Sequence, residues 1–300
     1  MRGVNVAKSR IVSSDTFLKE ARRIAGQAQD KGIVLRVMGG VAIALHSSKY
    51  REFAERLGRL GKGIEQEFSD LDFMAFKKQM KQVIDFLTKD LGYIKRRPTI
   101  STATSQRLIC FHPKERFYAD IFFDKLLVAN HPIDFRKRLT IDSPTISVSD
   151  LLLEKIQMWE AFGQKDLKDC LVLIRAHDVG ETDEENINAK YVAKLLSIDW
   201  GFWYTATTNL RKIKKCVDKL EEIGPKVDID PELISEEERA DISNKTAKLL
   251  EYISIEKKQM KWKLRSKIGT TKKWYKHVET PEAVSGFGIW HAKEIFPENK

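Results

Sequence analysis

We predict an α/β fold in which helices flank a mixed β-sheet, followed by a C-terminal half that is entirely helical. Short β-branched runs alternate with helical periodicity up to about residue 147. After that point apolar residues recur at helical spacing and strand patterns become rare. The 300 residues suffice for one large domain or two ordinary ones. We therefore divide the chain into an α/β domain over 1–147, a helical extension over 148–200 and a basic helical region over 201–300.

Composition excludes several classes of protein. With 42% hydrophobic residues the chain is too apolar to be disordered, and with 16 Gly and 8 Pro it is too poor in both to be fibrous. The three cysteines lie far apart without a C-x-x-C pair, so they encode neither a disulfide framework nor a zinc knuckle. The longest apolar run, 41–45, is far short of the ~20 residues that span a bilayer. We expect a cytoplasmic protein without a membrane partner.

The charge excess narrows the class of partner. Lysine and arginine number 53 against 43 acidic residues, which gives a formal net charge of +10. Such an excess favours a polyanionic partner, either nucleic acid or a nucleotide. The same excess is equally compatible with a soluble protein that has no such partner, so net charge alone does not indicate a function.

Two periodicities define the elements of the first 147 residues. Apolar residues at spacings of three and four, such as Phe17, Ala21 and Ile24, indicate helices, and Ser14 stands where the N-cap of the first helix belongs. β-Branched runs and period-two alternation indicate strands. The polar, glycine-punctuated stretch 47–66 is expected to be an insertion or a mobile loop. The predicted elements are helices up to residue 30 and over 41–46 and 77–91, with strands over 33–38, 69–76, 107–112 and 118–123.

Helical periodicity continues beyond residue 147. Ser149 is expected to cap a helix that starts at Asp150. The acidic stretch 181–185 is expected to be a linker, and the last 23 residues are expected to form a docked or loose tail. The predicted helices cover 150–162, 165–176, the segment around 191–196, 203–223 and 236–267.

Two acidic residues stand two positions apart in the predicted strand 69–76. Side chains at i and i+2 of a strand point to the same face, so Asp70 and Asp72 share a surface, with Cα atoms about 7 Å apart. Two such carboxylates can ligate hard divalent cations such as Mg²⁺, which prefer oxygen ligands and keep positions open for substrate phosphates. A solvent-exposed acidic strand face is the alternative interpretation.

Two other features indicate the same chemistry. Gly39-Gly40 lies between a strand and a helix, where the absence of Cβ allows close backbone approach and the helix N-terminus offers amide donors to a phosphate. Asp120 lies in the strand 118–123, whose apolar neighbours would bury it, and a buried carboxylate is costly unless it meets a metal or a cation. Taken separately, a tight turn would explain the glycines and a capping role would explain the aspartate.

The order of these motifs resembles the nucleotidyltransferase superfamily that includes DNA polymerase beta. That family has an apolar residue with Gly-Gly or Gly-Ser, then Asp-x-Asp, then a third acidic residue on a later strand. The corresponding motifs here are Met38-Gly39-Gly40, Ser69-Asp70-Leu71-Asp72 and Ala119-Asp120-Ile121. The resemblance is to the minimal AbiEii-like branch in particular, because VMGGVAIALH, SDLDF, SDLLLEKIQ and KDLKD follow its order over about residues 33–175. The gap between Gly40 and Asp70 is longer than usual, which indicates an insertion over the site entrance.

This resemblance implies a fold and a metal site. It implies a nucleotidyltransferase-type catalytic domain over 1–147, with an active site completed by the helical extension 148–200. Asp70 and Asp72 would hold two Mg²⁺ or Mn²⁺ ions. Asp120 would be the third ligand, or the base that takes a proton from the acceptor hydroxyl. Metal ions ~3.5 to 4 Å apart can stabilise both the attacking and the leaving oxygens of a displacement at the α-phosphorus of a nucleoside triphosphate (NTP).

The resemblance also implies a nucleotide site. Lys155 matches the helical lysine of the family and would neutralise a β or γ phosphate, although an exposed helix lysine paired with a neighbouring acid is the alternative. Asp166 and Asp169 lie on one helical face and match the family's Asp-x-x-Asp, where they would orient Lys155 or contact the nucleotide. Two solvated acids would be the alternative. The residues expected to bind the nucleotide are Gly39, Gly40, Ser69, Lys155, Asp166 and Asp169.

Two other groups of residues have side chains that can take part in catalysis or binding. Arg51 and Arg56 in the predicted insertion could clamp a phosphate or the acceptor, but a solvated loop is favoured there. The six histidines show no H-x₃-H or H-E-x-x-H spacing, so the sequence offers no basis for a zinc or histidine-based hydrolase.

A basic stretch lies near the C-terminus. Residues 257–277 contain nine Lys and Arg and no acid, with Trp262, Trp274 and Tyr275 interleaved. Basic residues neutralise phosphates and aromatic faces stack on bases, so RNA or DNA contact is a hypothesis for this stretch. A solvated helix face whose tryptophans dock into the core is the alternative. The residues expected to contact nucleic acid are Lys272, Lys273 and Lys276.

The sequence thus predicts a Mg²⁺-dependent nucleotidyltransferase that moves an NMP group from an NTP to a hydroxyl on RNA, a protein or a small molecule. One alternative is a non-catalytic nucleic-acid-binding module with the same fold. Another is a two-metal phosphohydrolase. The first alternative depends on whether Asp70, Asp72 and Asp120 converge in an open cleft.

Overall fold

A five-stranded mixed sheet organises the N-terminal part of the protein. The computed structural model describes residues 12–59, 67–96, 107–115, 117–127, 131–219 and 229–276. The strand order is β1-β2-β5-β4-β3, in which β2 and β5 pair in parallel and the other neighbours are antiparallel. The strands are β1 (Leu35–Met38), β2 (Leu71–Ala75), β3 (Ile94–Lys95), β4 (Arg107–Phe111) and β5 (Tyr118–Phe123). The predicted α/β class with a mixed sheet is therefore confirmed.

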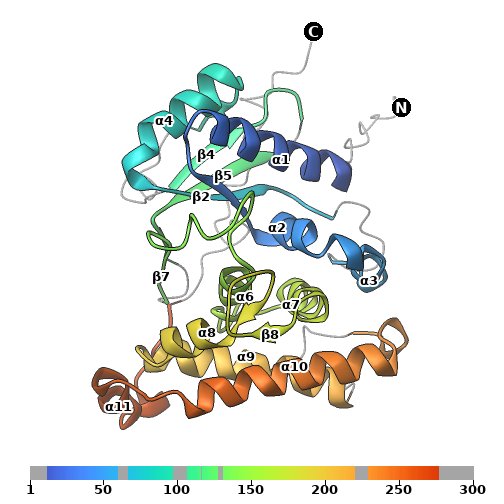
Figure 1. The fold of residues 1–300 in the computed structure, drawn as a ribbon, viewed down its shortest axis with the longest axis vertical. Helices are drawn as coiled ribbons and strands as arrows, with labels where there is room; N and C mark the ends of the chain where they lie inside the picture. The colour runs from blue at the N-terminus through green and yellow to red at the C-terminus, as the bar shows by residue number, and fades with distance from the viewer. Residues whose placement is uncertain are drawn as a thin grey trace, which may run out of the picture.

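Helices lie on both sides of this sheet. Figure 1 shows α1 and α4 on one side and α2 on the other. The predicted inner face of α1 is correct, since Phe17, Ala21 and Ile24 are fully buried. Its N-cap is Ser13 rather than Ser14, because the Ser13 side chain accepts a hydrogen bond from the Thr16 amide. The helices are α1 (Ser14–Asp30), α2 (Gly39–His46), α3 (Arg51–Leu57) and α4 (Met80–Asp85), and α4 lies between a 3₁₀ turn, Lys77–Gln79, and a π-helical turn, Phe86–Asp90.

The predicted loop over 47–66 is wrong in its first half. A 3₁₀ turn, Ser48–Tyr50, leads into α3, where Phe53 and Leu57 are buried one helical turn apart. Arg51 forms ion pairs with Glu55 and Glu67, so its side chain is held against this segment and is not solvated on all sides. The basic residues of this segment obscured the helical spacing of its buried apolar residues in the sequence. Residues 60–66 lie outside the described part of the chain.

The second half of the chain is helical, as predicted. Figure 1 shows α6 and α7 between the sheet and the two long helices α9 and α10. Two short strand pairs accompany them, β6 (Lys125–Leu126) with β7 (Ile133–Asp134) and β8 (Val179–Gly180) with β9 (Ile187–Asn188). The helices are α6 (Val148–Ile156), α7 (Gln164–Ala176), α8 (Ala189–Leu196), α9 (Trp200–Lys219), α10 (Glu236–Ile255) and α11 (Met260–Ser266), with 3₁₀ turns at Pro231–Leu233 and Gly269–Thr271.

The predicted boundaries of α6 are wrong at both ends. Its N-cap is Ser147, whose side chain accepts from the Asp150 amide, while Ser149 accepts from the Asn188 amide. It ends at Ile156 rather than 162, because Asn209 of α9 donates to the Ile156 carbonyl at the C-terminus of the helix. The bonds from Asn188 to Ser149 and from Asn209 to Ile156 both join residues that are distant in the sequence.

Two other expectations on the C-terminal half also change. The predicted helix over 236–267 is two helices, because the Lys258 ammonium donates to the carbonyls of Ile253 and Glu256 where α10 ends. The acidic stretch 181–185 is not a free linker, because Asp183 pairs with Arg138 at 2.7 Å. The predicted tail lies outside the described residues.

One apolar cluster joins the sheet to the helical layer. It runs from Phe73 and Ile121 in the sheet through Leu151 of α6 to Leu210 and Leu249 of α9 and α10. Helices α6 and α7 are therefore held firmly against α2, whose N-terminus lies at the end of β1. All three cysteines are buried, and none of them forms a disulfide. No helix in the described ranges has the length and apolarity that crossing a bilayer requires.

Candidate functional site

The pairing of β2 with β5 places Asp72 beside Asp120. The two residues are Cα partners in a parallel pair, so their side chains leave the same face of the sheet at the same level. Asp70 lies immediately before β2, while Leu71 and Phe73 are fully buried on the opposite face. Asp120 is only 2% exposed, whereas Asp70 and Asp72 are half-buried. The alternation expected from the sequence is thus present.

Asp120 and Asp70 each have specific hydrogen-bond partners. Arg107 of β4 donates to both carboxylate oxygens of Asp120, with Nε at 2.8 Å from each. The Tyr118 hydroxyl donates to Oδ2 of Asp70 at 2.9 Å, and the Ser69 hydroxyl donates to Oδ1 of the same residue at 3.1 Å. Any cation shared by the aspartates would compete with Arg107 and Tyr118.

The three carboxylates repel one another. Burial, Asp70 and Asp120 together raise the pKa of Asp72 well above its usual range. Burial also raises the pKa of Asp120, although Arg107 offsets part of this effect. Such an excess of negative charge and of oxygen donors suits Mg²⁺ chemically. The ligand atoms of Asp70, Asp72 and Asp120 do not all lie within 4.8 Å of one another, so these side chains would have to draw closer around an ion.

Gly39 packs directly against Asp72. Its φ is +69°, a left-handed conformation that disfavours residues with a side chain. A Cβ built on Gly39 would lie 2.6 Å from Oδ2 of Asp72, which is closer than real Cβ contacts. The Gly39 amide donates to Oε2 of Glu154 at 3.1 Å. Both conformation and space therefore require glycine at this position.

A buried ion network lies on the α6 and α7 side of the glycines. Lys155 is only 6% exposed, and its Nζ lies 3.1 Å from Asp169 and 3.7 Å from both Asp166 and Glu154. Burial alone would lower the pKa of Lys155, but Asp169, Glu154 and Asp166 raise it above its usual value. The pKa of Asp169 is lowered to about 2, because Arg59 and Lys155 outweigh its burial. Lys155 is thus neither exposed nor free, unlike a solvated helix lysine.

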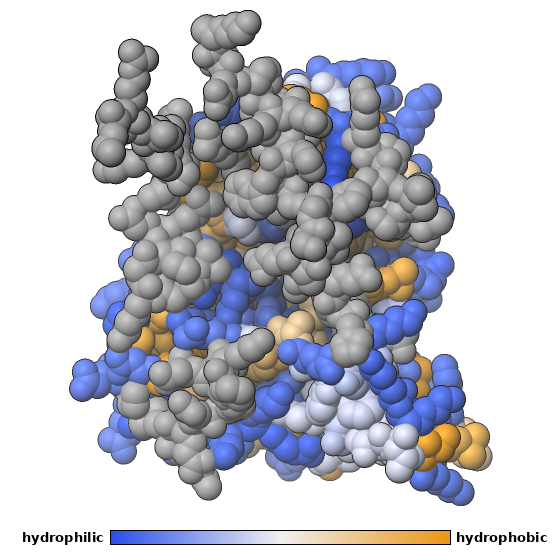
Figure 2. Space-filling model, turned by 180° about the vertical axis from the view of Figure 1, so that it is seen from behind, coloured by the Kyte–Doolittle hydropathy of each residue, from blue (hydrophilic) through white to orange (hydrophobic). Residues whose placement is uncertain are grey.

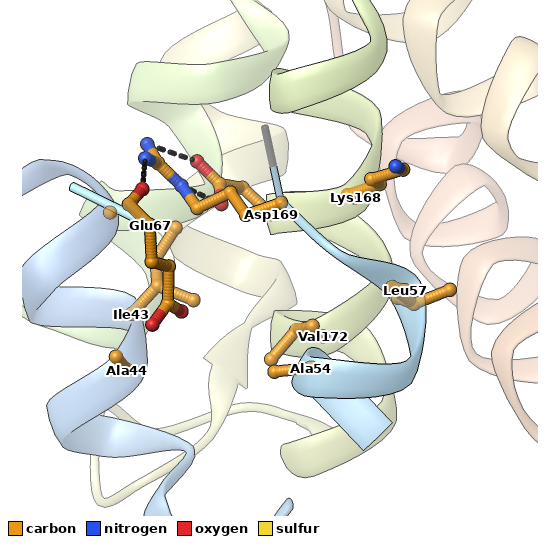
Figure 3. Close-up of a pocket in the computed structure, with 10 residues that line it drawn as sticks. Ile43, Ala44, Ala54, Leu57, Glu67, Lys168, Asp169 and Val172 are labelled. Carbon is orange, nitrogen blue, oxygen red and sulfur yellow. Dashed lines mark hydrogen bonds and ion pairs between the residues drawn. The ribbon is translucent and has the colours of Figure 1, made fainter. Parts of the chain in front are cut away.

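Arg59 connects the predicted insertion to this network. Its guanidinium forms two bonds to Asp169, at 2.7 and 3.1 Å. It also covers Gly40, because a Cβ there would lie 2.4 Å from the guanidinium carbon. Figure 3 shows a cavity at this point, bounded by residues of α2, α3 and α7. At about 20 Å³ the cavity has room for about one water molecule.

The other two insertion arginines do not reach the aspartates. Arg51 is bound to Glu55 and Glu67, and Arg56 pairs with Glu238 of α10 at 2.6 Å. Neither presents its guanidinium to the face that carries Asp72. The prediction that this segment contributes a solvated loop is therefore wrong, and the arginine at the network is Arg59.

The basic stretch forms a separate surface. Lys272, Lys273 and Lys276 are exposed beyond α11. Trp262 packs against Trp203 of α9, and Trp274 lies 4.9 Å from both Trp159 and Tyr204, measured between ring centroids. These contacts favour the docked alternative for the tryptophans, while the lysines face solvent. Figure 2 shows exposed apolar side chains beside hydrophilic ones at the corner that α11 forms, where the exposed apolar residues are Met260, Leu264 and Ile268.

Four residues at the site were not among those expected from the sequence. Arg107 and Tyr118 touch the aspartates, and Glu154 and Arg59 complete the glycine and lysine contacts. Tyr118 stands two positions before Asp120, so its place on the same face follows from strand period. Nothing local marks Arg107, because it reaches Asp120 only through the pairing of β4 with β5.

Comparison with known proteins adds little to this geometry. No protein-family model and no curated protein matches the chain. Among solved structures it is similar to the one titled the crystal structure of JHP933 from Helicobacter pylori, with 12% sequence identity and a TM-score of 0.35. That match covers 88% of this chain and 100% of the other. A similarity at this level carries no inference about fold or activity, so the function must be argued from the site.

Proposed function

We propose that this protein is a Mg²⁺-dependent nucleotidyltransferase that moves an NMP group from an NTP to a hydroxyl acceptor. The observation that carries the proposal is the side-by-side placement of Asp72 and Asp120 on parallel strands, with Gly39 against Asp72. Asp70, two residues before Asp72, adds a third carboxylate. Three carboxylates therefore lie next to a backbone turn at which Gly39 leaves no room for a Cβ.

The aspartates would hold the metal ions. Asp70 and Asp72 are half-buried, and Asp120 is almost fully buried beside Asp72. When bound, Mg²⁺ would supply the positive charge that stabilises the attacking and leaving oxygens at the α-phosphorus. Burial raises the pKa of Asp120, so its carboxylate is a stronger base than an exposed aspartate and would accept the proton of the acceptor hydroxyl.

The glycines and the ion network would bind the triphosphate. Gly39 and Gly40 open the N-terminus of α2, where the helix dipole attracts anions, and a phosphate would take the place that the Glu154 carboxylate holds at the Gly39 amide. Lys155 and Arg59 are positioned by Asp169 beside this turn. A triphosphate would draw on their positive charge, with Asp166 and Asp169 holding both cations in place. Ser69 would help to orient Asp70.

The acceptor is the least constrained part of the proposal. The exposed Lys272, Lys273 and Lys276 are suited to the phosphates of RNA, so RNA is the acceptor class that the surface charge favours. A cytoplasmic location would bring the protein together with NTPs and RNA.

The experiment is incubation of the protein with each of the four NTPs, Mg²⁺ and total RNA or a protein extract, followed by mass spectrometry. The expected result is an acceptor with an added NMP, together with pyrophosphate. Asp72→Asn should abolish the product, while Asp85→Asn, the same substitution at a residue of α4 whose side chain is 40% exposed, should not. Release of phosphate without a modified acceptor would favour the phosphohydrolase instead. RNA binding without any turnover would favour the non-catalytic module.

A further inference from the structure

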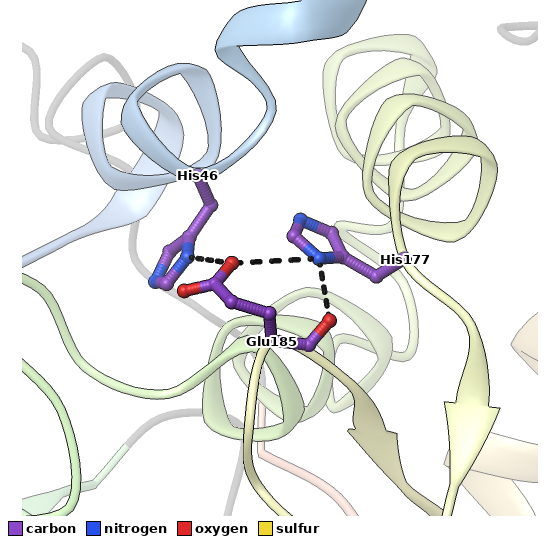
Figure 4. A group of neighbouring side chains, drawn as sticks. All are labelled: His46, His177 and Glu185. Atoms are coloured by element: carbon purple, nitrogen blue, oxygen red, sulfur yellow. Dashed lines mark hydrogen bonds and ion pairs between the residues drawn. The ribbon is translucent and has the colours of Figure 1, made fainter.

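A second cluster of metal-ligand side chains lies away from the aspartates. It consists of His46, His177 and Glu185, whose ligand atoms all lie within 4.8 Å of one another. In the described part of the chain this is the group of histidine, cysteine and acidic side chains that meets this distance. Figure 4 shows the three side chains pointing toward one another from different elements. None of them belongs to the proposed nucleotidyltransferase site.

The hydrogen bonds of His46 leave one ring nitrogen facing an anion. Its Nε2 lies 3.2 Å from the Ile146 carbonyl and 2.6 Å from the Thr145 hydroxyl. A carbonyl oxygen only accepts, so Nε2 is protonated when it bonds to Ile146, whereas Nε2 accepts when the Thr145 hydroxyl donates to it. In the first tautomer Nδ1 presents a lone pair to Oε2 of Glu185 at 3.1 Å, and a cation between these two acceptors would remove their repulsion. In the second tautomer Nδ1–H donates to Glu185.

His177 completes the donor set. Its side chain is 4% exposed, and its Nδ1 lies 3.8 Å from Oε2 of Glu185 and 2.9 Å from the Glu185 carbonyl. The carbonyl accepts from Nδ1–H, so metal binding through Nδ1 would break this bond and move the proton to Nε2, which is buried without a hydrogen-bond partner among the described residues. Tetrahedral coordination at bond lengths of about 2.0 to 2.2 Å separates neighbouring ligand atoms by roughly 3.4 Å. The distances of 3.1 and 3.8 Å from Oε2 to the two imidazole nitrogens fall on either side of that value.

The surroundings also favour a cation. His46 is the last residue of α2 and His177 follows the last residue of α7, so two helix C-termini with their partial negative charge converge here. Asp142 lies 3.4 Å from Nε2 of His46 and adds an acid on the outer side of the ring, where second-shell carboxylates orient metal-binding imidazoles. A cavity of about 240 Å³, lined by His46, Asp142 and Glu185, adjoins the cluster, and the Glu185 side chain is 65% exposed. An ion can therefore reach it.

We propose that His46, His177 and Glu185 form a site for a divalent transition-metal ion such as Zn²⁺. Two imidazoles and one carboxylate are the donors that Zn²⁺ takes, whereas Mg²⁺ prefers oxygen ligands alone. The ion would join the C-terminal ends of α2 and α7. These are the two helices whose N-terminal parts carry Gly39 and Asp169, so it would stiffen the scaffold behind the proposed nucleotide site. The site itself does not depend on the proposed function.

Metal binding can be tested on the full chain after dialysis against a chelator. Zn²⁺ is titrated by calorimetry, and Co²⁺ is titrated by visible absorption, which reports nitrogen ligation. Wild type should bind one ion more per chain than Glu185→Gln, or bind it more than about 100-fold more tightly, because even loss of an outer-shell partner costs about 10- to 100-fold. Zn²⁺ should raise the Tm of wild type and leave that of Glu185→Gln unchanged.

Three controls keep the result interpretable. His46→Gln should abolish the same binding event, and if that variant fails to fold, Glu185→Gln decides because its side chain is exposed. His112→Gln alters a half-buried histidine on another part of the protein and should leave Zn²⁺ binding intact. Asp72→Asn should also keep it, since the aspartates are a different site. Wild type without Zn²⁺ or Co²⁺ binding, or Glu185→Gln with the same stoichiometry and affinity as wild type, would overturn the proposal.

Discussion

Replacement of Asp72 by asparagine should stabilise the metal-free protein. Asp72 and Asp120 are direct partners on adjacent strands, which lie about 4.8 Å apart. At a separation of about 5 Å and an effective dielectric constant of ~20, two like charges repel by about 3 kcal/mol. Arg107 neutralises part of the charge on Asp120. A net gain of roughly 1 to 2 kcal/mol remains for Asp72→Asn, which corresponds to a rise in Tm of roughly 4 °C.

The pH dependence of this gain shows that it comes from the charge of Asp72. The pKa of Asp72 is raised in the folded state by burial first and then by Asp70 and Asp120, so the cost of its charge is absent below the ordinary value of 3.8 and complete only above the raised pKa. The difference between Asp72→Asn and wild type should therefore be large at pH 8 and small near pH 4. Thermal unfolding in EDTA at both pH values measures it. Asp85→Asn, which removes an exposed charge, should change stability by no more than about 1 kcal/mol at either pH.

Mg²⁺ should reverse the order of the two proteins. A ligand that binds only the native state adds RT ln(1 + [L]/Kd), about 2.7 kcal/mol at a hundredfold excess over Kd. Wild type should gain this increment with Mg²⁺ and NTP, and Asp72→Asn should not. The reasoning fails if Asp72→Asn is less stable than wild type at pH 8 in EDTA, or if its Tm still rises with Mg²⁺ and NTP.

Lys155→Met should weaken binding of a non-hydrolysable NTP analogue, with Lys155→Arg retaining part of the affinity, because a buried cation is lost in the first and kept in the second; equal affinity of Lys155→Met and wild type would exclude the assignment. The pKa of about 2 for Asp169 against 3.8 for a free aspartate corresponds to about 2 kcal/mol of stability, present above pH 4 and lost as the pH falls toward 2. Urea unfolding at pH 5 and pH 2.5 should reveal this loss in wild type, and a loss just as large in Asp169→Asn would assign it to other groups. Changing Lys272, Lys273 and Lys276 to Glu should lower RNA affinity and reduce the salt slope by about 2, since each lost contact to a single strand removes ~0.7. Filter binding across salt concentrations measures this slope, and charge reversal at exposed Lys19 and Lys89 is the matched control.

Local patterns predicted most of the fold. Strand and helix periods depend only on neighbours in the sequence, so the mixed α/β class, the inner face of α1 and the helical second half were all accessible. The ends of the helices were harder to predict from local patterns. Two serines stand at each predicted cap of α1 and α6, and the choice between Ser147 and Ser149 depends on Asn188, which lies about 40 residues away. The basic residues of α3 hid the buried Phe53 and Leu57.

The candidate site divides in the same way. Period-two alternation alone placed Asp70 and Asp72 on one face, and the left-handed φ of Gly39 is a property that its residue type permits. That Asp120 lies beside Asp72, that Arg107 holds Asp120 and that Arg59 reaches Asp169 were decided by strand pairing and helix packing. These contacts join segments 13 to 110 residues apart. Sequence spacing carries no information on such pairs, because their distance is set by which strands and helices become neighbours when the core is buried.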